Sequence, residues 1–209
     1  MYLSRIKLDT SRTGTMRGLA SPSVFHGAIE CADKERTRKL WRVDTLYGEQ
    51  ILLVLSEDRI DLTSVAEQFG YDSSYESKIY DGLLERITNG SRWHFRLKAN
   101  PTIQKYDENK GRGRVLAHIT TEYQGEWLKK QAEKNGFSLK DEEWLVTGSR
   151  WYVFRKNRNR RDKVKMLAAV YEGVLTVTDA EAFRNALIKG IGREKAFGMG
   201  MLTVTRVMK

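Results

Sequence analysis

Strand-like and helix-like segments occur in the same order in both halves of the chain, and this order most restricts the possible folds. In the first half, apolar spacing and capping residues predict a strand at 2–9, a helix at 22–33, strands at 40–47 and 50–56, a helix at 62–69 and an ambiguous segment at 80–87. If 80–87 forms a closing strand, residues 1–88 have the β-α-β-β-α-β order of a ferredoxin-like unit.

The helix expected at 22–33 is clearly marked. Ser21 is a typical N-cap residue, and Pro22 follows at the first helical position. Apolar residues then recur at helical spacing at Phe25, Ile29 and Ala32. His26 therefore lies in the first turns of this helix.

The second half repeats the order. Its segments are a strand near 93–97, a helix at 122–135, strands at 143–154 and 164–177, a helix from a capping box at 178–181 to Gly190, and a strand at 201–207. Between the first strand and the first helix, residues 100–121 are predicted to be an extended loop with a short strand at 115–120. The first strand has one apolar face and one basic face, because Trp93, Phe95 and Leu97 alternate with His94, Arg96 and Lys98.

The predicted fold class is α+β, with two tandem ferredoxin-like (RRM-like) domains. The boundary falls at the turn-forming residues Asn89, Gly90 and Ser91. Domain 1–88 carries the helix with His26, and domain 91–209 carries a basic hairpin and a glycine-rich loop.

Positive charge is concentrated in one segment. The chain has 37 Lys and Arg against 27 Asp and Glu, a net charge of +10. Residues 155–165 contain seven cations and one anion between two predicted strands, so they form the tip of a hairpin. Such a run is often only a solvated loop, but it also suits a polyanion such as a nucleic acid.

The glycine-rich loop spans residues 190–200. It contains Gly190, Gly192, Gly198 and Gly200 together with Arg193 and Lys195. Glycines let backbone N–H groups approach a phosphate closely, and the two cations supply counter-charge. The spacing fits neither a dinucleotide-binding fingerprint nor a P-loop, so RNA backbone is the ligand that the loop suggests. The alternative is a helix C-cap at Gly190 followed by a tight turn.

Other classes of function find little support. The only cysteine, Cys31, cannot form an internal disulfide, no apolar run approaches a membrane span, and the N-terminus lacks a signal-peptide core. A cytoplasmic location without a membrane partner is the expectation. The three histidines are scattered and no Asp-x-Asp pair occurs, so neither a metal site nor another cofactor is expected.

Five segments of the chain are informative together, namely Met1–Ser4, Leu40–Asp44, Phe95–Pro101, Tyr171–Leu175 and the glycine-rich loop. In this order, and over essentially the whole chain, they resemble the CasE family, the CRISPR repeat-RNA endoribonucleases of the type I-E Cascade complex. The resemblance implies metal-independent cleavage of precursor CRISPR RNA at the base of each repeat hairpin. It also implies that the enzyme stays on the 3′ hairpin of the mature crRNA, beside other Cascade subunits.

The resemblance assigns the catalytic role to His26, which matches the family's catalytic histidine. Known members have a tyrosine three residues before it and some have a lysine five after it, whereas this chain has Ser23 and Cys31. Ser23, Lys34 and Arg36 are the candidate helpers. The departures leave an alternative open, a non-catalytic RNA-hairpin-binding subunit on the same fold.

The RNA-binding candidates lie in the basic tip and the glycine-rich loop. The ends of a short A-form stem are open enough for cations to follow its phosphates. The predicted RNA-binding residues are Arg155, Lys156, Arg158, Arg160, Arg161, Lys163, Gly190, Gly192, Arg193, Lys195, Gly198 and Gly200.

Overall fold

A computed structural model describes residues 1–35, 37–72, 75–107, 111–155 and 163–207. The first part of the chain forms β1 (Tyr2–Leu8), α1 (Thr13–Ala20), α2 (Ser23–Ala32), β2 (Lys39–Leu46), β3 (Glu49–Ser56), α3 (Thr63–Phe69), β4 (Glu76–Ile79) and α4 (Asp81–Leu84). Its antiparallel sheet has the order β2-β3-β1-β4. This is the strand arrangement of a ferredoxin-like unit, and it confirms the predicted order of the first half.

The second part has the same arrangement. It forms β5 (Arg92–Ala99), β6 (Thr102–Asp107), β7 (Arg112–Ala117), α5 (Thr121–Lys134), β8 (Phe137–Arg155), β9 (Lys163–Val177), α6 (Ala180–Lys189), the short 3-10 helix η2 (Lys195–Phe197) and β10 (Leu202–Arg206). The sheet order β10-β5-β9-β8 again places the first and third strands of the unit at its centre. The predicted fold class, α+β with two tandem ferredoxin-like units, is therefore confirmed.

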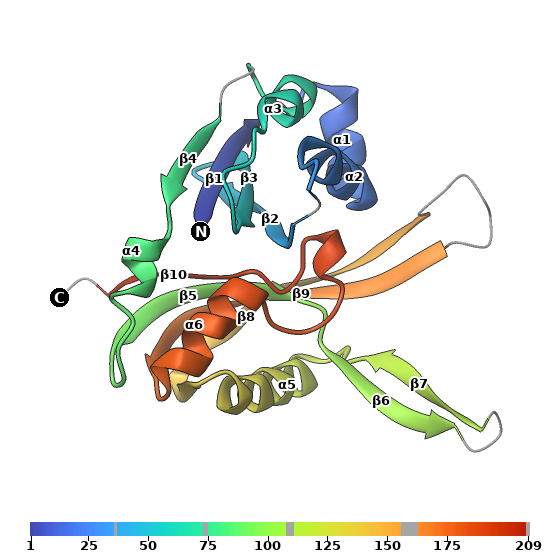
Figure 1. The fold of residues 1–209 in the computed structure, drawn as a ribbon. Helices are drawn as coiled ribbons and strands as arrows, with labels where there is room; N and C mark the ends of the chain where they lie inside the picture. Colours follow the sequence, from blue (N-terminus) through green and yellow to red (C-terminus); the bar gives the residue numbers. More distant parts are fainter. Residues whose placement is uncertain (36, 73–74, 108–110, 156–162, 208–209) are drawn as a thin grey trace.

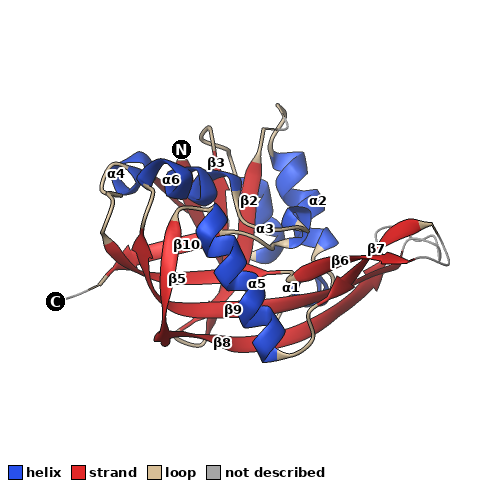
Figure 2. Ribbon diagram, turned by 90° about the horizontal axis from the view of Figure 1, so that it is seen from below, coloured by secondary structure: helices blue, strands red, loops and turns tan. Residues whose placement is uncertain are grey.

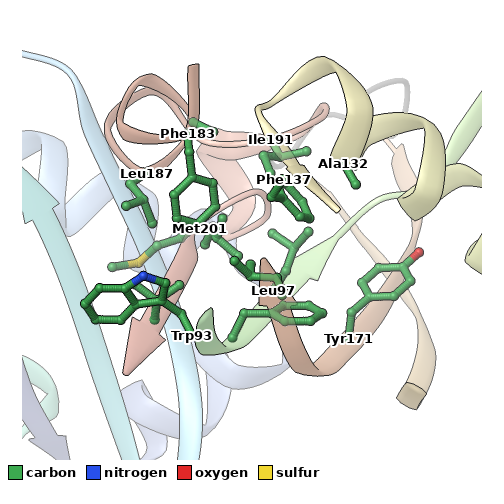
Figure 3. Close-up of a cluster of buried hydrophobic side chains, with 14 of the residues drawn as sticks. Trp93, Leu97, Ala132, Phe137, Tyr171, Phe183, Leu187, Ile191 and Met201 are labelled. Atoms are coloured by element: carbon green, nitrogen blue, oxygen red, sulfur yellow. The ribbon is translucent and has the colours of Figure 1, made fainter. Parts of the chain in front are cut away.

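The two units pack face to face. The first unit lies over one face of the second sheet, while α5 and α6 cover the other face (Figure 1). Seen from below, α5 crosses the strands of the second sheet (Figure 2). Apolar residues of the second unit form the larger core, of which Figure 3 shows Trp93, Leu97, Phe183 and Met201. Leu40 of the first unit belongs to the same core, so the interface is continuous with it.

The structure differs from the sequence prediction in several elements. The closing strand is β4, upstream of 80–87, because Tyr80, Leu84 and Ile87 are buried at helical spacing and form part of a short helical turn. Helix α1 was missed, since the residues that it buries are Thr15 and Gly18, which are not apolar core residues. Residues 102–117 form the β6–β7 hairpin rather than a mostly extended loop. Exposed Ile103 and Tyr106 show that burial does not set the pattern of this hairpin.

Strand β8 also begins earlier than predicted, at Phe137 instead of residue 143. The register between β8 and β9 shifts between Leu139 and Trp144, where Glu142 has a φ of 72°. This bulge interrupts the alternation of apolar and polar residues that the sequence prediction depended on. The strand is therefore longer than its sequence pattern indicates.

Arg42 of β2 fixes the orientation of the two units. Its side chain is only 1% exposed, and its five N–H groups all donate hydrogen bonds. Two go to the Asp44 carboxylate at 2.7 and 2.8 Å, and three reach the second unit, at the carbonyls of residues 96 and 201 and the hydroxyl of Thr203. The guanidinium of Arg42 therefore finds acceptors for all of its N–H groups only when the two units are docked.

Replacing Arg42 with Met is expected to destabilise the protein by about 3–5 kcal/mol, because it leaves the Asp44 charge and two carbonyls buried without their donor. Urea unfolding followed by circular dichroism measures the loss. Arg5→Met is the matched control. Arg5 is half exposed in its ion pair with Glu76, so its replacement should cost at most about 1 kcal/mol. Equal losses in the two variants would contradict the role given to Arg42.

Candidate active site

His26 is held at the surface by its buried neighbour. Phe25 is 1% exposed and makes edge contacts with Trp41 and Phe69, at ring distances of 5.9 and 4.9 Å. These contacts fix α2 against the first unit, and the next residue along the helix points away from that core. The His26 side chain is 36% exposed, while its backbone N–H donates to the Pro22 carbonyl.

The imidazole of His26 lies between its own helix and the second unit. Its ring meets the edge of the Phe197 ring in η2 at 6.3 Å. Its Nδ1 lies 4.0 Å from Oε1 of Glu30, one turn further along α2. With Nδ1 toward Glu30, Nε2 at the far end of the ring is the nitrogen available to a ligand.

A buried lysine forms ion pairs with two carboxylates at the end of α2. The Lys39 side chain is 1% exposed, and its Nζ lies 2.5 Å from Asp33 and 3.5 Å from Glu30. The hydrogen bond from Lys39 lowers the pKa of Asp33 to about 2. Asp33 and Lys39 therefore form a charged pair at neutral pH, beside the carboxylate that faces His26.

The three candidate helpers have different surroundings. The Ser23 hydroxyl lies 3.1 Å from that of Ser21, one turn before His26. Lys34 is exposed and lies beyond the end of α2, about two helical turns from His26, in a shallow groove that Cys31 also lines. Arg36 lies outside the described residues. Of the three, Ser23 is on the same stretch of helix face as His26.

The glycine-rich loop packs directly against the first unit. Gly198 has a φ of +74°, and a Cβ there would lie 2.7 Å from the Trp41 ring. Two residues further on, the N–H of Gly200 donates to the carbonyl of Lys98 at 2.7 Å, which joins the loop to β5. Gly198 and Gly200 are buried, so packing explains why glycine is needed at both positions. Gly190 and Gly192 are partly exposed.

A third cation, which the sequence analysis missed, lies beside the two cations of this loop. Arg193 is exposed, and Lys195 donates to the carbonyl of Gly192. Partial burial lowers the pKa of Lys195, and the nearby Arg38 lowers it further. Arg38 comes from the segment before β2, so only the packing of the two units brings it to this loop.

The β8–β9 hairpin leads away from the same place. Phe154 of β8 contacts Phe197 at 5.0 Å, and the next residue, Arg155, is exposed opposite Lys163 of β9. The predicted RNA-binding residues Lys156, Arg158, Arg160 and Arg161 lie outside the described residues. The described base of the basic hairpin therefore begins beside the loop that touches His26.

Sequence analysis also missed a cationic cleft between the units. A cavity of about 340 Å³ is lined by Lys98 and Arg96 of β5, Arg150 and Tyr152 of β8, and residues of β2. Lys98 donates to the Tyr152 hydroxyl at 3.0 Å, and the Arg150 guanidinium lies 4.2 Å from the centre of that ring. The basic face predicted for the 93–97 strand was the available signal, but nothing in the sequence indicated which surface it would face.

The other two histidines lie elsewhere. His94 is exposed on β5, and His118 lines a groove beside α5. Among the residues that the structure describes, no three His, Cys, Asp or Glu side chains are grouped as metal ligands. Within the same residues, no helix has the length and apolar character to cross a membrane.

Comparison with known proteins adds a family and a fold. The model of the CRISPR associated protein family matches residues 1–206. The CRISPR-associated endoribonuclease Cse3 of Thermus thermophilus is 27% identical over 98% of this chain and 99% of its own. A structure of CRISPR endoribonuclease Cse3 bound to a 19-nucleotide RNA has a TM-score of 0.80 at 25% identity, with 98% and 100% of the two chains covered. A chain of a CRISPR RNA-guided surveillance complex shares the fold, with a TM-score of 0.74 at 20% identity over 99% and 100% of the chains.

Proposed function

Since the chain belongs to the CRISPR associated protein family, we propose that it is an endoribonuclease that cleaves precursor CRISPR RNA at the base of the repeat hairpin. The similarity to Cse3 over nearly the whole of both chains supports an RNA-cleaving role. The observation that carries the proposal is the contact of the His26 ring with Phe197, because it joins a histidine to the basic loop and hairpin of the other unit.

The proposed reaction needs no group beyond the RNA and the side chains. The 2′-hydroxyl oxygen bonds to the adjacent phosphorus, its proton passes to a base, the bond from phosphorus to the 5′-oxygen breaks, and that oxygen takes up a proton. The products are a 2′,3′-cyclic phosphate and a 5′-hydroxyl. An imidazole can accept or donate a proton near neutral pH, so His26 suits either step.

Nearby cations can stabilise the extra negative charge of the reacting phosphate. Arg38, Arg193 and Lys195 come from both units and lie at the loop that touches the His26 helix. Ser23 is the helper best placed by its position on α2. Lys34 remains a weaker candidate because it is two turns away.

RNA binding is assigned mainly to the second unit, which spans residues 91–209. Arg155 and Lys163, with the basic tip between them, follow the phosphates of the stem. The glycine-rich loop holds the backbone near the cut, with Gly190 and Gly192 as its accessible glycines. The catalytic helix belongs to the unit at residues 1–88.

After cleavage, the protein stays on the 3′ hairpin of the mature crRNA as a subunit of Cascade. The occurrence of the same fold in a surveillance complex is consistent with this role. The location proposed for the protein is the cytoplasm, where its transcript substrate is made.

Incubation of the protein with a repeat hairpin in excess EDTA tests the proposal. A shorter product is expected at the base of the stem, at a rate close to that without chelator. Loss of cleavage with EDTA and its restoration by a divalent cation would refute the metal-independent mechanism. Binding of the RNA without any shortening would favour the non-catalytic alternative. That alternative is based on Ser23 and Cys31 at the positions of the family's helper residues.

The described base of the hairpin should contribute phosphate contacts. Replacing Arg155 and Lys163 with Ala should weaken hairpin binding and reduce the slope of log affinity against log salt by about 0.7–0.9 for each lost contact. Fluorescence anisotropy at several salt concentrations measures the slope. Arg86→Ala with Lys140→Ala removes the same charge from exposed positions elsewhere and should leave the slope unchanged. Equal slopes in the two double variants would exclude the hairpin base from RNA contact.

A further inference from the structure

A groove with a volume of about 630 Å³ lies outside the proposed active site, between α5 and the β6–β7 hairpin. It lies on the side of the second sheet that α5 and α6 cover, whereas α2, the helix that contains His26, lies on the other side (Figures 1 and 2). The stem base at His26 therefore cannot occupy this groove. Any ligand bound here contacts a separate surface of the protein.

Two stacked rings form one wall of the groove. His118 and Tyr123 lie 5.9 Å apart with 30° between their planes, and Tyr123 is 55% exposed. Burial lowers the pKa of His118, which favours the neutral form of this ring. Beside the rings, Ile119 is 67% exposed. The wall thus offers a flat, accessible aromatic and apolar platform of the kind on which an unpaired base can stack.

The lining of the groove is also basic. Lys105 comes from β6, and Lys130 and Lys134 come from successive turns of α5. None of these three lysines forms an ion pair within the described part of the chain. Glu126 is the acidic residue among those lining the groove, so the lining has a net positive charge. Cations next to a stacking platform favour a ligand with alternating phosphates and bases.

Double-stranded RNA does not fit this combination, because its bases are stacked on each other and cannot reach a ring. An acidic peptide would use the lysines but would leave the aromatic platform without a matching group. We propose that this groove binds unpaired RNA, namely the strand immediately upstream of the repeat hairpin. The upstream strand stays covalently attached to the stem after cleavage, whereas the downstream strand departs, so this assignment depends on the proposed function.

The test compares two RNAs, a minimal repeat hairpin and the same hairpin with an upstream single strand of roughly ten nucleotides, within the site sizes of single-strand grooves. The wild-type protein should bind the extended RNA more tightly. Tyr123→Ala should weaken binding of the extended RNA by about 5- to 150-fold, the contribution of one base–aromatic stack. Its affinity for the minimal hairpin and its cleavage rate should not change.

Two further variants separate a stacking role from a general effect on the fold. Tyr106→Ala removes an exposed tyrosine from the same β6–β7 hairpin but outside the groove lining, and it should bind both RNAs as the wild type does. Lys130→Ala with Lys134→Ala should reduce the salt slope for the extended RNA alone, by about 0.7 for each contact.

Several results would overturn the assignment. Equal affinity of the wild-type protein for the two RNAs, or an equal loss on both in Tyr123→Ala, would exclude upstream binding. If Tyr123→Ala weakened binding of the minimal hairpin, and this loss disappeared when a non-nucleotide linker replaced the loop, the groove would bind the loop. If Tyr123→Ala changed neither RNA but prevented association with another Cascade subunit, the groove would be a protein-docking surface. Failure of the proposed function is separate, because it appears as no binding or cleavage of the minimal hairpin.

Discussion

His26→Ala should reduce the rate of repeat-RNA cleavage by about 10²- to 10⁴-fold, the usual contribution of a positioned general acid or base. The affinity for the hairpin should change little, because the role proposed for His26 is proton transfer, while most of the proposed phosphate contacts belong to the second unit. Single-turnover cleavage measures the rate, and anisotropy with an uncleavable RNA measures the affinity.

The matched control is His94→Ala. His94 is also an exposed histidine, but it lies on β5. It is not part of the lining of the cationic cleft, and the ring contact with Phe197 of η2 is made by His26. Its replacement should leave the cleavage rate as in the wild type. Full activity of His26→Ala, or an equal loss in both variants, would remove His26 from the mechanism.

A repeat hairpin with one 2′-deoxy nucleotide just upstream of the cut should not be cleaved at all. The missing oxygen is the nucleophile of the proposed reaction, and no water molecule replaces it in that mechanism. Binding should be nearly unchanged, since the phosphates and the stem that supply most of the affinity remain. Gel analysis of product formation, with a competition assay for binding, measures both effects.

The control RNA carries its 2′-deoxy nucleotide one position further upstream and should be cleaved normally. The products of the all-RNA substrate should carry a 2′,3′-cyclic phosphate and a 5′-hydroxyl. Cleavage of the first deoxy RNA at the same position would mean that water is the nucleophile. The role of His26 would then have to be derived again around an activated water molecule.

Much of the fold is predictable because its signals are local. Residues close in sequence determine caps and apolar periodicity, so α2, the β2–β3 hairpin and α6 lie where their patterns place them. Asp179 illustrates this: its side chain accepts hydrogen bonds from the N–H groups of Glu181 and Ala182 at the start of α6. Errors occurred where burial does not impose a period, as in the exposed β6–β7 hairpin.

The site is only partly predictable for the same reason. The placement of His26 on a helix, the basic stretch and the glycine-rich loop can be inferred from the sequence alone. Their convergence cannot, because His26 and Phe197 are far apart in the chain and meet only when the two units dock.

Docking itself depends on long-range complementarity. Arg42 donates to two backbone carbonyls of the other unit, one in β5 and one just before β10, and Gly198 leaves room for Trp41. The same docking brings Arg38 to the glycine-rich loop and turns Lys98 toward a cleft shared with the first unit. The sequence therefore determined the elements and the chemistry they carry, whereas the tertiary structure decided which of those groups meet, because packing and buried hydrogen bonds join residues that no local pattern links.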